Sequence, residues 1–207
     1  MSVKDLYPAI RPSLNLDFAN TKTLDPRITF SRASTGTYYD GVTHAKAEEN
    51  LFTYSQQFDQ TDWAKTNSSV TTNDTTAPDG TTTAEKLTAT ITPARGVSQN
   101  PSVLAADYAI SFYAKEGTIS FAFVREYITA NAERVTYFNL STGAVGTTGS
   151  GHTASIVSVG NGWYRCVVVC TPNAARSQLV QFGGCDADGS LTVTPTGTIY
   201  ILSLIHI

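Results

Sequence analysis

The sequence is poor in charge, in methionine and in patterns that would build amphipathic helices. Only 15% of the 207 residues are charged, the formal net charge is -3, and a single methionine is present. This composition argues against a disordered chain and against a helical protein rich in ion pairs. Because the basic residues are scattered along the chain, we expect no electrostatic footprint for nucleic acid or for an anionic membrane surface.

Long apolar runs are also missing. The longest apolar stretches are far shorter than the roughly 20 residues that a membrane-spanning helix needs. The first residues do not combine a basic segment with an apolar one, so the sequence predicts no Sec-type export signal. We therefore expect a soluble protein without a membrane partner.

Cysteine is scarce and odd in number, which disfavours a disulfide framework. The three cysteines are Cys166, Cys170 and Cys185. On a regular strand Cys166 and Cys170 would lie about 13 Å apart, whereas a disulfide needs Cα atoms within about 7 Å. The histidines are far apart in sequence, so no zinc spacing is present either. We expect all three thiols to be free and to act as small core side chains.

What the sequence does have is threonine, serine, glycine and aromatic residues in alternating runs. Residues 108–127 form two such runs joined at 115–118, which predicts a hairpin. The runs over 133–147 and 154–171 repeat the pattern, with turns at Ser-Thr-Gly and at Gly160-Asn161-Gly162. Strands spaced in this way predict an all-β fold, an antiparallel β-sandwich or jelly roll.

Strands and turns are also predicted in the earlier part of the chain. Residues 13–19 and 27–34 alternate at period two and are expected to be half-buried strands, with a D-G turn in the "YYDGV" that follows. The stretch from residue 50 to 66 predicts a strand leading into a loop. The threonine-rich segment from 67 to 92 predicts two strands divided by an A-P-D-G turn.

Several motifs resemble phage structural proteins. "LDFANTKTLDPRITFSRASTGTYYD" resembles the N-terminal segment of tail and head-fibre proteins, and "NLFTYSQQFDQTDWAKT", "APDGTTTAEKL", "YAISFYAKEG" and "VGNGWYRCVVV" resemble the head spike or tail fibre modules of tailed phages. The resemblance implies a carbohydrate-binding-module-like jelly roll on the virion, assembled in the host cytoplasm. It also implies adhesion to cell-surface or environmental polysaccharide, contacts with other virion proteins, and a homo-oligomer, expected to be a trimer.

The resemblance also sets the expected domain boundaries. Residues 1–49 would be an extended N-terminal arm, residues 50–201 the jelly-roll module, and residues 202–207 a non-native tail. The connection between "YYDG" and "ENLFTYS" is shorter than in the family. After "TGTIYI" the chain reads "LSLIHI", which resembles adapter-derived sequence on a truncated reading frame, instead of the family's W-G-A-Q-type continuation.

A glycan site needs aromatic rings that stack on the apolar faces of sugars, with polar groups for the hydroxyls. In the stretch "WYRCVVVC", alternation assigns the cysteine-bearing face to the core and leaves Trp163 and Arg165 on the opposite face. A plug at the sandwich rim is the other interpretation of that pair. The predicted glycan-binding residues are Trp163, Arg165, Tyr127, Arg125, Tyr113 and Trp63, and a lid over the end of the sandwich is the other interpretation of Trp63.

Two further kinds of site were weighed. Asp186 and Asp188 in "CDADGS" form a fragment of a calcium-loop pattern, which makes a structural calcium the one cofactor considered, but the further acidic ligands are missing and a surface turn between strands is the favoured interpretation. No pair of carboxylates stands out for glycosidase chemistry, and no nucleophile-elbow motif is present. We therefore expect no enzyme. The alternatives to glycan binding are a purely structural capsid or tail decoration protein and a polysaccharide-degrading enzyme.

Overall fold

Strands joined by tight turns make up the fold. The computed structural model describes residues 37–39, 44–46, 50–93, 95–129 and 132–206, and no helix occurs among them. Consequently, this described part holds no helical membrane-span candidate. The chain divides into two units, Met1–Ala47 and Glu48–Ile207.

In the first unit, β1 (Thr37–Tyr39) pairs antiparallel with β2 (His44–Lys46). The D-G turn expected between them and the strands expected at 13–19 and 27–34 lie outside the described residues.

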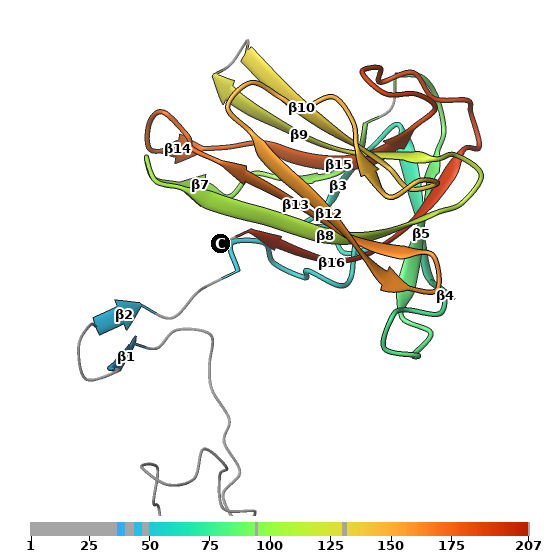
Figure 1. Cartoon of the computed structure of the whole chain (residues 1–207), viewed down its shortest axis with the longest axis horizontal. Helices are drawn as coiled ribbons and strands as arrows, with labels where there is room; N and C mark the ends of the chain where they lie inside the picture. The colour runs from blue at the N-terminus through green and yellow to red at the C-terminus, as the bar shows by residue number, and fades with distance from the viewer. Residues whose placement is uncertain (1–36, 40–43, 47–49, 94, 130–131, 207) are drawn as a thin grey trace, which may run out of the picture. The chain divides into compact units, whose positions relative to one another are not determined.

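Two six-stranded antiparallel sheets form a sandwich in the second unit (Figure 1). One sheet has the order β11-β10-β9-β15-β6-β3, the other the order β12-β13-β8-β16-β5-β4, and β14 and β7 form a small ribbon. The strands are β3 (Ala64–Thr66), β4 (Ser68–Thr75), β5 (Ala84–Ala89), β6 (Gly96–Gln99), β7 (Ser102–Val103), β8 (Tyr108–Glu116), β9 (Phe121–Thr129), β10 (Ala132–Asn139), β11 (Ala144–Val145), β12 (Thr153–Gly160), β13 (Trp163–Cys170), β14 (Arg176–Ser177), β15 (Val180–Cys185) and β16 (Thr198–His206).

The strand pairing is nested in the way that defines a jelly roll. Strand β5 pairs with β16, β6 with β15, β8 with β13, and β9 with β10. Successive pairs alternate between the two sheets. These eight strands are therefore one antiparallel ribbon rolled into two layers, as the sequence predicts.

The core lies between the sheets and follows the alternation of the strands. On β13, Cys166, Val168 and Cys170 are buried, which confirms the face predicted for the cysteines. All three cysteines are free and buried, and burial raises the pKa of the Cys185 thiol to about 12. They are packing residues, as expected.

Two predicted hairpins are present and one is not. Strands β12 and β13 pair across a turn in which Asn161 and Gly162 have φ values of 53° and 76°, as a type I′ turn requires. Strands β10 and β11 also pair. The hairpin predicted at 115–118 is wrong, because β8 and β9 belong to different sheets. The connection between them crosses the sandwich edge.

The strand predicted from residue 50 is also wrong. Turns and bends continue as far as Trp63, and the first strand of the second unit, β3, starts at Ala64. Phe52, Phe58 and Trp63 are inserted into the core instead, with the Phe58 and Trp63 ring centroids 5.3 Å apart. Three buried aromatic side chains hold this segment as an ordered loop without ladder hydrogen bonds.

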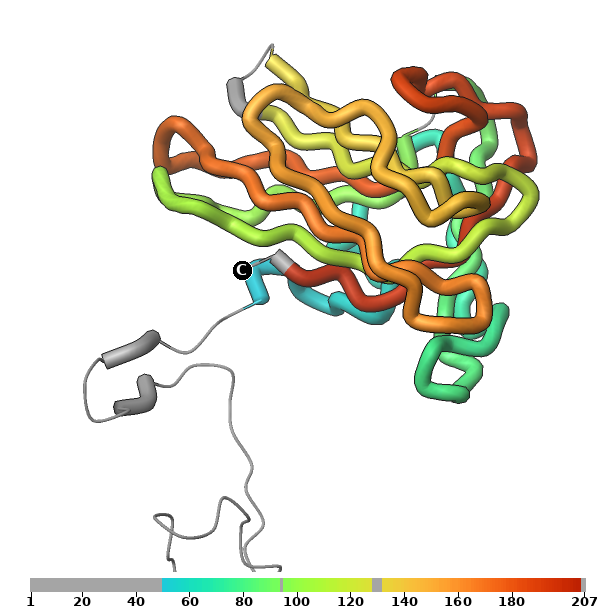
Figure 2. The backbone as a smooth tube through the Cα atoms, in the orientation of Figure 1, coloured from blue at the N-terminus to red at the C-terminus, as the bar shows by residue number. Residues whose placement is uncertain are grey.

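The predicted boundary at residue 201 falls inside β16. Leu202 pairs with Tyr113 on β8, and the Leu204 side chain is fully buried. Figure 2 shows the chain after residue 50 running beside this C-terminal strand, where Leu204 N–H donates to Ser55 O (2.8 Å) and the Asn50 amide donates to Leu204 O (3.0 Å). The adapter origin of residues 202–207 stays a prediction, but residues 202–206 belong to β16.

Candidate functional site

The predicted Trp163–Arg165 platform lacks an open aromatic face. Trp163 lies on the outer face of its sheet but is 0% exposed, because Ala77 and Ala84 cover it. Its indole N–H donates to Thr76 O (3.0 Å). Trp163 is therefore the rim plug of the alternative interpretation, and a ring so enclosed cannot stack on a sugar.

Two other predicted residues share that outer face. Arg165 is exposed, and Tyr113, its cross-strand neighbour on β8, is half-buried against the Trp163 cluster. The structure thus brings Trp163, Arg165 and Tyr113 together, and only the last two have accessible surface. A glycan-binding role for Arg165 and Tyr113 stays a prediction.

Arg125 and Tyr127 lie on β9, in the other sheet, and bind each other. The Arg125 guanidinium lies 4.8 Å from the centroid of the Tyr127 ring and donates to the Tyr127 hydroxyl. It also donates to Gln181 Oε1 (3.2 Å) and forms an ion pair with Glu133. Arg125 is only 4% exposed. Its two Nη groups are thus occupied within the fold, and a glycan-binding role for Arg125 and Tyr127 stays a prediction.

The two aspartates of "CDADGS" are exposed, and each accepts hydrogen bonds from a threonine. Asp186 Oδ2 accepts from Thr194 N–H and from the Thr194 hydroxyl, both at 2.8 Å. Asp188 accepts from Thr147 N–H (2.7 Å) and the Thr147 hydroxyl (3.0 Å). Among the described residues no group of three or more acidic, histidine or cysteine side chains could hold a metal ion. A calcium role for Asp186 and Asp188 stays a prediction.

A buried polar network surrounds Glu126 on β9. Its carboxylate accepts from His152 Nε2 (2.9 Å) and from the Gln178 amide, and Arg134 lies 3.5 Å away. Burial acts to raise the pKa of Glu126, but the hydrogen bond and charge of His152, together with Cys170 and Arg134, outweigh it, so the pKa lies below its ordinary value. The network holds the two sheets together at this end.

The same network includes a hydroxyl–imidazole–carboxylate chain, because the Thr136 hydroxyl lies 2.7 Å from His152 Nδ1. Such a chain activates nucleophiles in hydrolases. Here Thr136 and the side chains of His152 and Glu126 are fully buried. No substrate reaches these three side chains in this arrangement, so the hydroxyl–imidazole–carboxylate chain has a structural role.

The site that the sequence interpretation missed is a surface hollow at Tyr54. Tyr54 is 51% exposed and is the only aromatic residue among the exposed large side chains of the described part. The hollow, about 420 Å³ in volume, is lined by Tyr54, Ser55, Gln56, Gln57, Asn73 and Thr83. One ring beside neutral hydrogen-bonding side chains could stack on a single sugar ring and bind its hydroxyls.

Core contacts fix the backbone beneath this ring. The carbonyl of Tyr54 accepts from the Trp63 indole N–H (3.0 Å) and from Gln57 N–H (3.0 Å). Trp63, predicted as a stacking residue, is 1% exposed and is instead a positioning residue for Tyr54. The buried Glu85 carboxylate accepts from Phe58 N–H (2.9 Å) and anchors the far side of the loop.

Tyr54 also has an unusual backbone conformation. Its φ is +47°, and Asn73 across the hollow has a φ of +52°. Asparagine tolerates this left-handed region, whereas a bulky side chain rarely adopts it. Strain of this kind is concentrated at functional sites. The one sequence signal for this site is the polar run Ser-Gln-Gln after Tyr54, which lies within the stretch predicted to be a strand leading into a loop.

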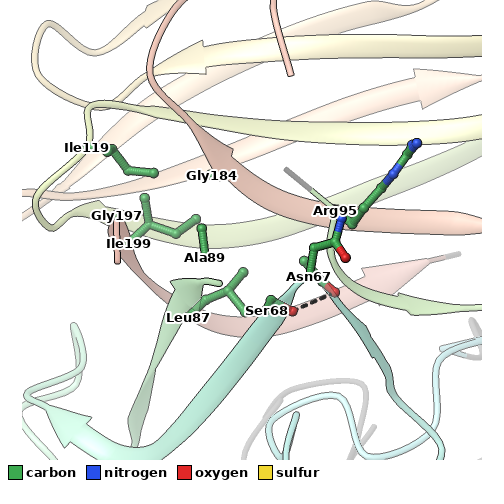
Figure 3. Close-up of a pocket in the computed structure, with 10 residues that line it drawn as sticks. Asn67, Ser68, Leu87, Ala89, Arg95, Ile119, Gly184, Gly197 and Ile199 are labelled. Carbon is green, nitrogen blue, oxygen red and sulfur yellow. Dashed lines mark hydrogen bonds between the residues drawn. The ribbon is translucent and has the colours of Figure 1, made fainter. Parts of the chain in front are cut away.

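The other hollows fit a sugar less well. Figure 3 shows the cavity between the sheets, where Leu87, Ile119 and Ile199 leave only about 10 Å³, the space of about one water molecule. A surface hollow of about 460 Å³ beside Asp186 is lined by hydroxyls, Pro195 and Ile119, with no aromatic among its described residues. The Tyr54 hollow alone among these three combines width with an exposed ring.

The fold and this hollow define a jelly-roll module with a solvent-facing aromatic site. No family model and no curated protein matches the sequence. Among solved structures, the chain is similar to the enzymatically active domain of tailspike protein 4 of bacteriophage CBA120, with 19% identity and a TM-score of 0.45. That similarity covers 76% of this chain and 21% of the tailspike chain, so the protein spans about a fifth of its length.

Two further similar structures are those of a candidate sugar-binding protein and of a protein–sugar complex. One is a candidate sugar-binding protein of Bacteroides thetaiotaomicron VPI-5482, with 12% identity, a TM-score of 0.38 and coverage of 70% of this chain and 86% of that one. The other is TmCBM61 in complex with β-1,4-galactotriose, with 10% identity, a TM-score of 0.37 and coverage of 77% and 99%. At such identities and TM-scores, a shared ligand or activity does not follow.

Proposed function

We propose that this protein is a non-catalytic glycan-binding module of a phage virion and that the Tyr54 hollow is its binding site. The observation that carries the proposal is the exposed Tyr54 ring set among Gln56, Gln57 and Asn73. A pyranose ring would stack its C–H face on the tyrosine while the amides bind its hydroxyls. The placement on a virion rests on the motifs that resemble phage fibre and spike proteins.

Binding at one such shallow site is expected to be weak. Repeated copies on a particle would raise the apparent affinity through effective concentration. Attachment to a polysaccharide-coated surface therefore fits a fibre or spike that is present in several copies, as the predicted trimer would be.

The test replaces Tyr54 without disturbing the loop. Asparagine removes the ring and tolerates a positive φ, so Tyr54→Asn is expected to fold at least as well as the parent chain. Its affinity for a bound polysaccharide should fall by about tenfold or more, the equivalent of about 1.4 kcal/mol of stacking. Affinity electrophoresis in gels that contain galactan, xylan, glucan or mannan measures this loss.

The matched controls are Tyr54→Phe, which keeps the ring and should bind nearly as the parent does, and Leu104→Ala, which changes a 67% exposed side chain outside the hollow. Unchanged affinity in Tyr54→Asn would reject the hollow as the site. Release of oligosaccharides from any bound polysaccharide would favour the enzyme alternative, and absence of binding to every glycan would favour a purely structural protein.

A further inference from the structure

We infer that the Tyr54 hollow selects neutral glycans and rejects uronate-containing or sulfated ones. The inference rests on the proposed glycan-binding function and adds the chemical class of the ligand. It comes from the charges in and around the hollow.

The described lining of the hollow carries no charge. Its polar groups are the amides of Gln56, Gln57 and Asn73 and the hydroxyls of Ser55 and Thr83. Each amide offers a donor and an acceptor together. This pairing suits neighbouring sugar hydroxyls, which both donate and accept, whereas a ligand carboxylate or sulfate only accepts.

The two described lysines nearest in sequence to the lining residues, Lys65 and Lys86, are already engaged. Lys86 Nζ donates to Asp74 Oδ1 (2.7 Å), directly after Asn73 in sequence. Lys65 Nζ donates to the carbonyls of Asp59 and Gln60, each at 2.6 Å. An anionic ligand would therefore have to break one of these contacts to gain a cation partner.

One carboxylate is linked to the lining of the hollow, and another is near it in sequence. The Thr83 hydroxyl lies 2.8 Å from the Thr81 hydroxyl, which donates to Asp79 Oδ1 (2.7 Å), and Asp59 follows Gln57 by two residues. The hydroxyl and N–H of Thr81 donate to Asp79 and hold the pKa of that carboxyl below its ordinary value, so it stays ionised. A charged ligand that loses water without gaining a counter-charge is disfavoured, and nearby like charges add to the penalty.

The experiment compares the full chain against two matched sets of polysaccharides. Galactan, xylan, glucan and mannan are the neutral probes, and alginate, polygalacturonate and heparin the anionic ones. We expect at least one neutral glycan to bind at least about tenfold more tightly than any anionic one. If no glycan binds, the proposed function fails; if an anionic glycan binds as tightly as the best neutral one, only the selectivity is overturned.

A second variant tests the cause of the selectivity. Thr83→Lys places a free cation on the exposed rim of the hollow, and Leu104→Lys adds the same charge at an exposed position outside it. We expect Thr83→Lys to gain alginate binding that weakens with salt, and Leu104→Lys to gain clearly less. Equal behaviour of the two variants would overturn the inference that missing cations at the hollow exclude anionic ligands.

Discussion

Glu85 and Glu126 are both buried carboxylates, but their surroundings push their pKa values in opposite directions. Burial raises the pKa of Glu85 to about 7, against the opposing hydrogen bond from Phe58 N–H. The folded state thus favours protonated Glu85: its contribution to stability is fully present below the ordinary pKa and is lost as the pH rises through about 7. Glu126, with its lowered pKa, contributes stability that is present above the ordinary pKa and is lost on acidification.

Glu85→Gln is accordingly expected to stabilise the protein above pH 7, by about 1–2 kcal/mol, because the neutral amide keeps an acceptor for Phe58 N–H without the buried charge. Glu126→Gln should instead destabilise it near neutral pH by about 3–5 kcal/mol, since Arg134 loses its negative partner and His152 Nε2 keeps only a neutral amide acceptor. Urea unfolding at pH 5 and pH 8 measures both changes. A destabilised Glu85→Gln at pH 8 would contradict the assignment.

At the scale of elements, β16 joins the two regions in which sequence reasoning fell short. The strand continues past the expected boundary, with Leu204 fully buried and hydrogen-bonded to Ser55 in the Tyr54 loop. Leu204→Ala should therefore cost about 2–5 kcal/mol in unfolding free energy, whereas Leu104→Ala on the surface should cost less than about 0.5 kcal/mol. Equal, small effects in a urea titration would show that residues 202–206 are not integral to the sheet.

Alternation and turn residues predicted most strands and two hairpins, because these depend on neighbours in sequence. The β8–β9 connection could not be predicted in this way: a tight turn that closes a hairpin and one that carries the chain to the opposite sheet have similar local sequences. Period two also assigned Cys166 to the core correctly, yet it could not show that the turn at Thr76 and Ala77 covers Trp163 from outside. That contact joins segments 87 residues apart.

Local sequence patterns could not identify the candidate site either. Strand alternation points to Trp163 and a polar loop context points to Trp63, whereas neither pattern singles out Tyr54. In the fold, both tryptophans are buried, and each donates its indole N–H to a loop carbonyl. Exposure of Tyr54 depends on the loop conformation that Trp63 fixes, and no local pattern contains that information.

At the scale of the whole molecule, the rolled ribbon predicts cooperative unfolding. The first strand of the nested ribbon, β5, pairs with the last, β16, which also pairs with β8 in the interior of its sheet. Opening one end of the ribbon therefore releases strands that support the other end. The unit Glu48–Ile207 is expected to unfold in one transition.

The two tryptophans test this, because they report on separate clusters. Trp63 lies in the cluster between the sheets, and Trp163 lies in the cluster with Ala77 and Ala84 on an outer face. The variants Trp63→Phe and Trp163→Phe each leave one fluorophore. For each variant, the urea midpoint by fluorescence should coincide with that variant's own midpoint by far-UV circular dichroism, even if both shift from the parent value. An earlier fluorescence midpoint in Trp63→Phe alone would mean that the outer cluster opens separately.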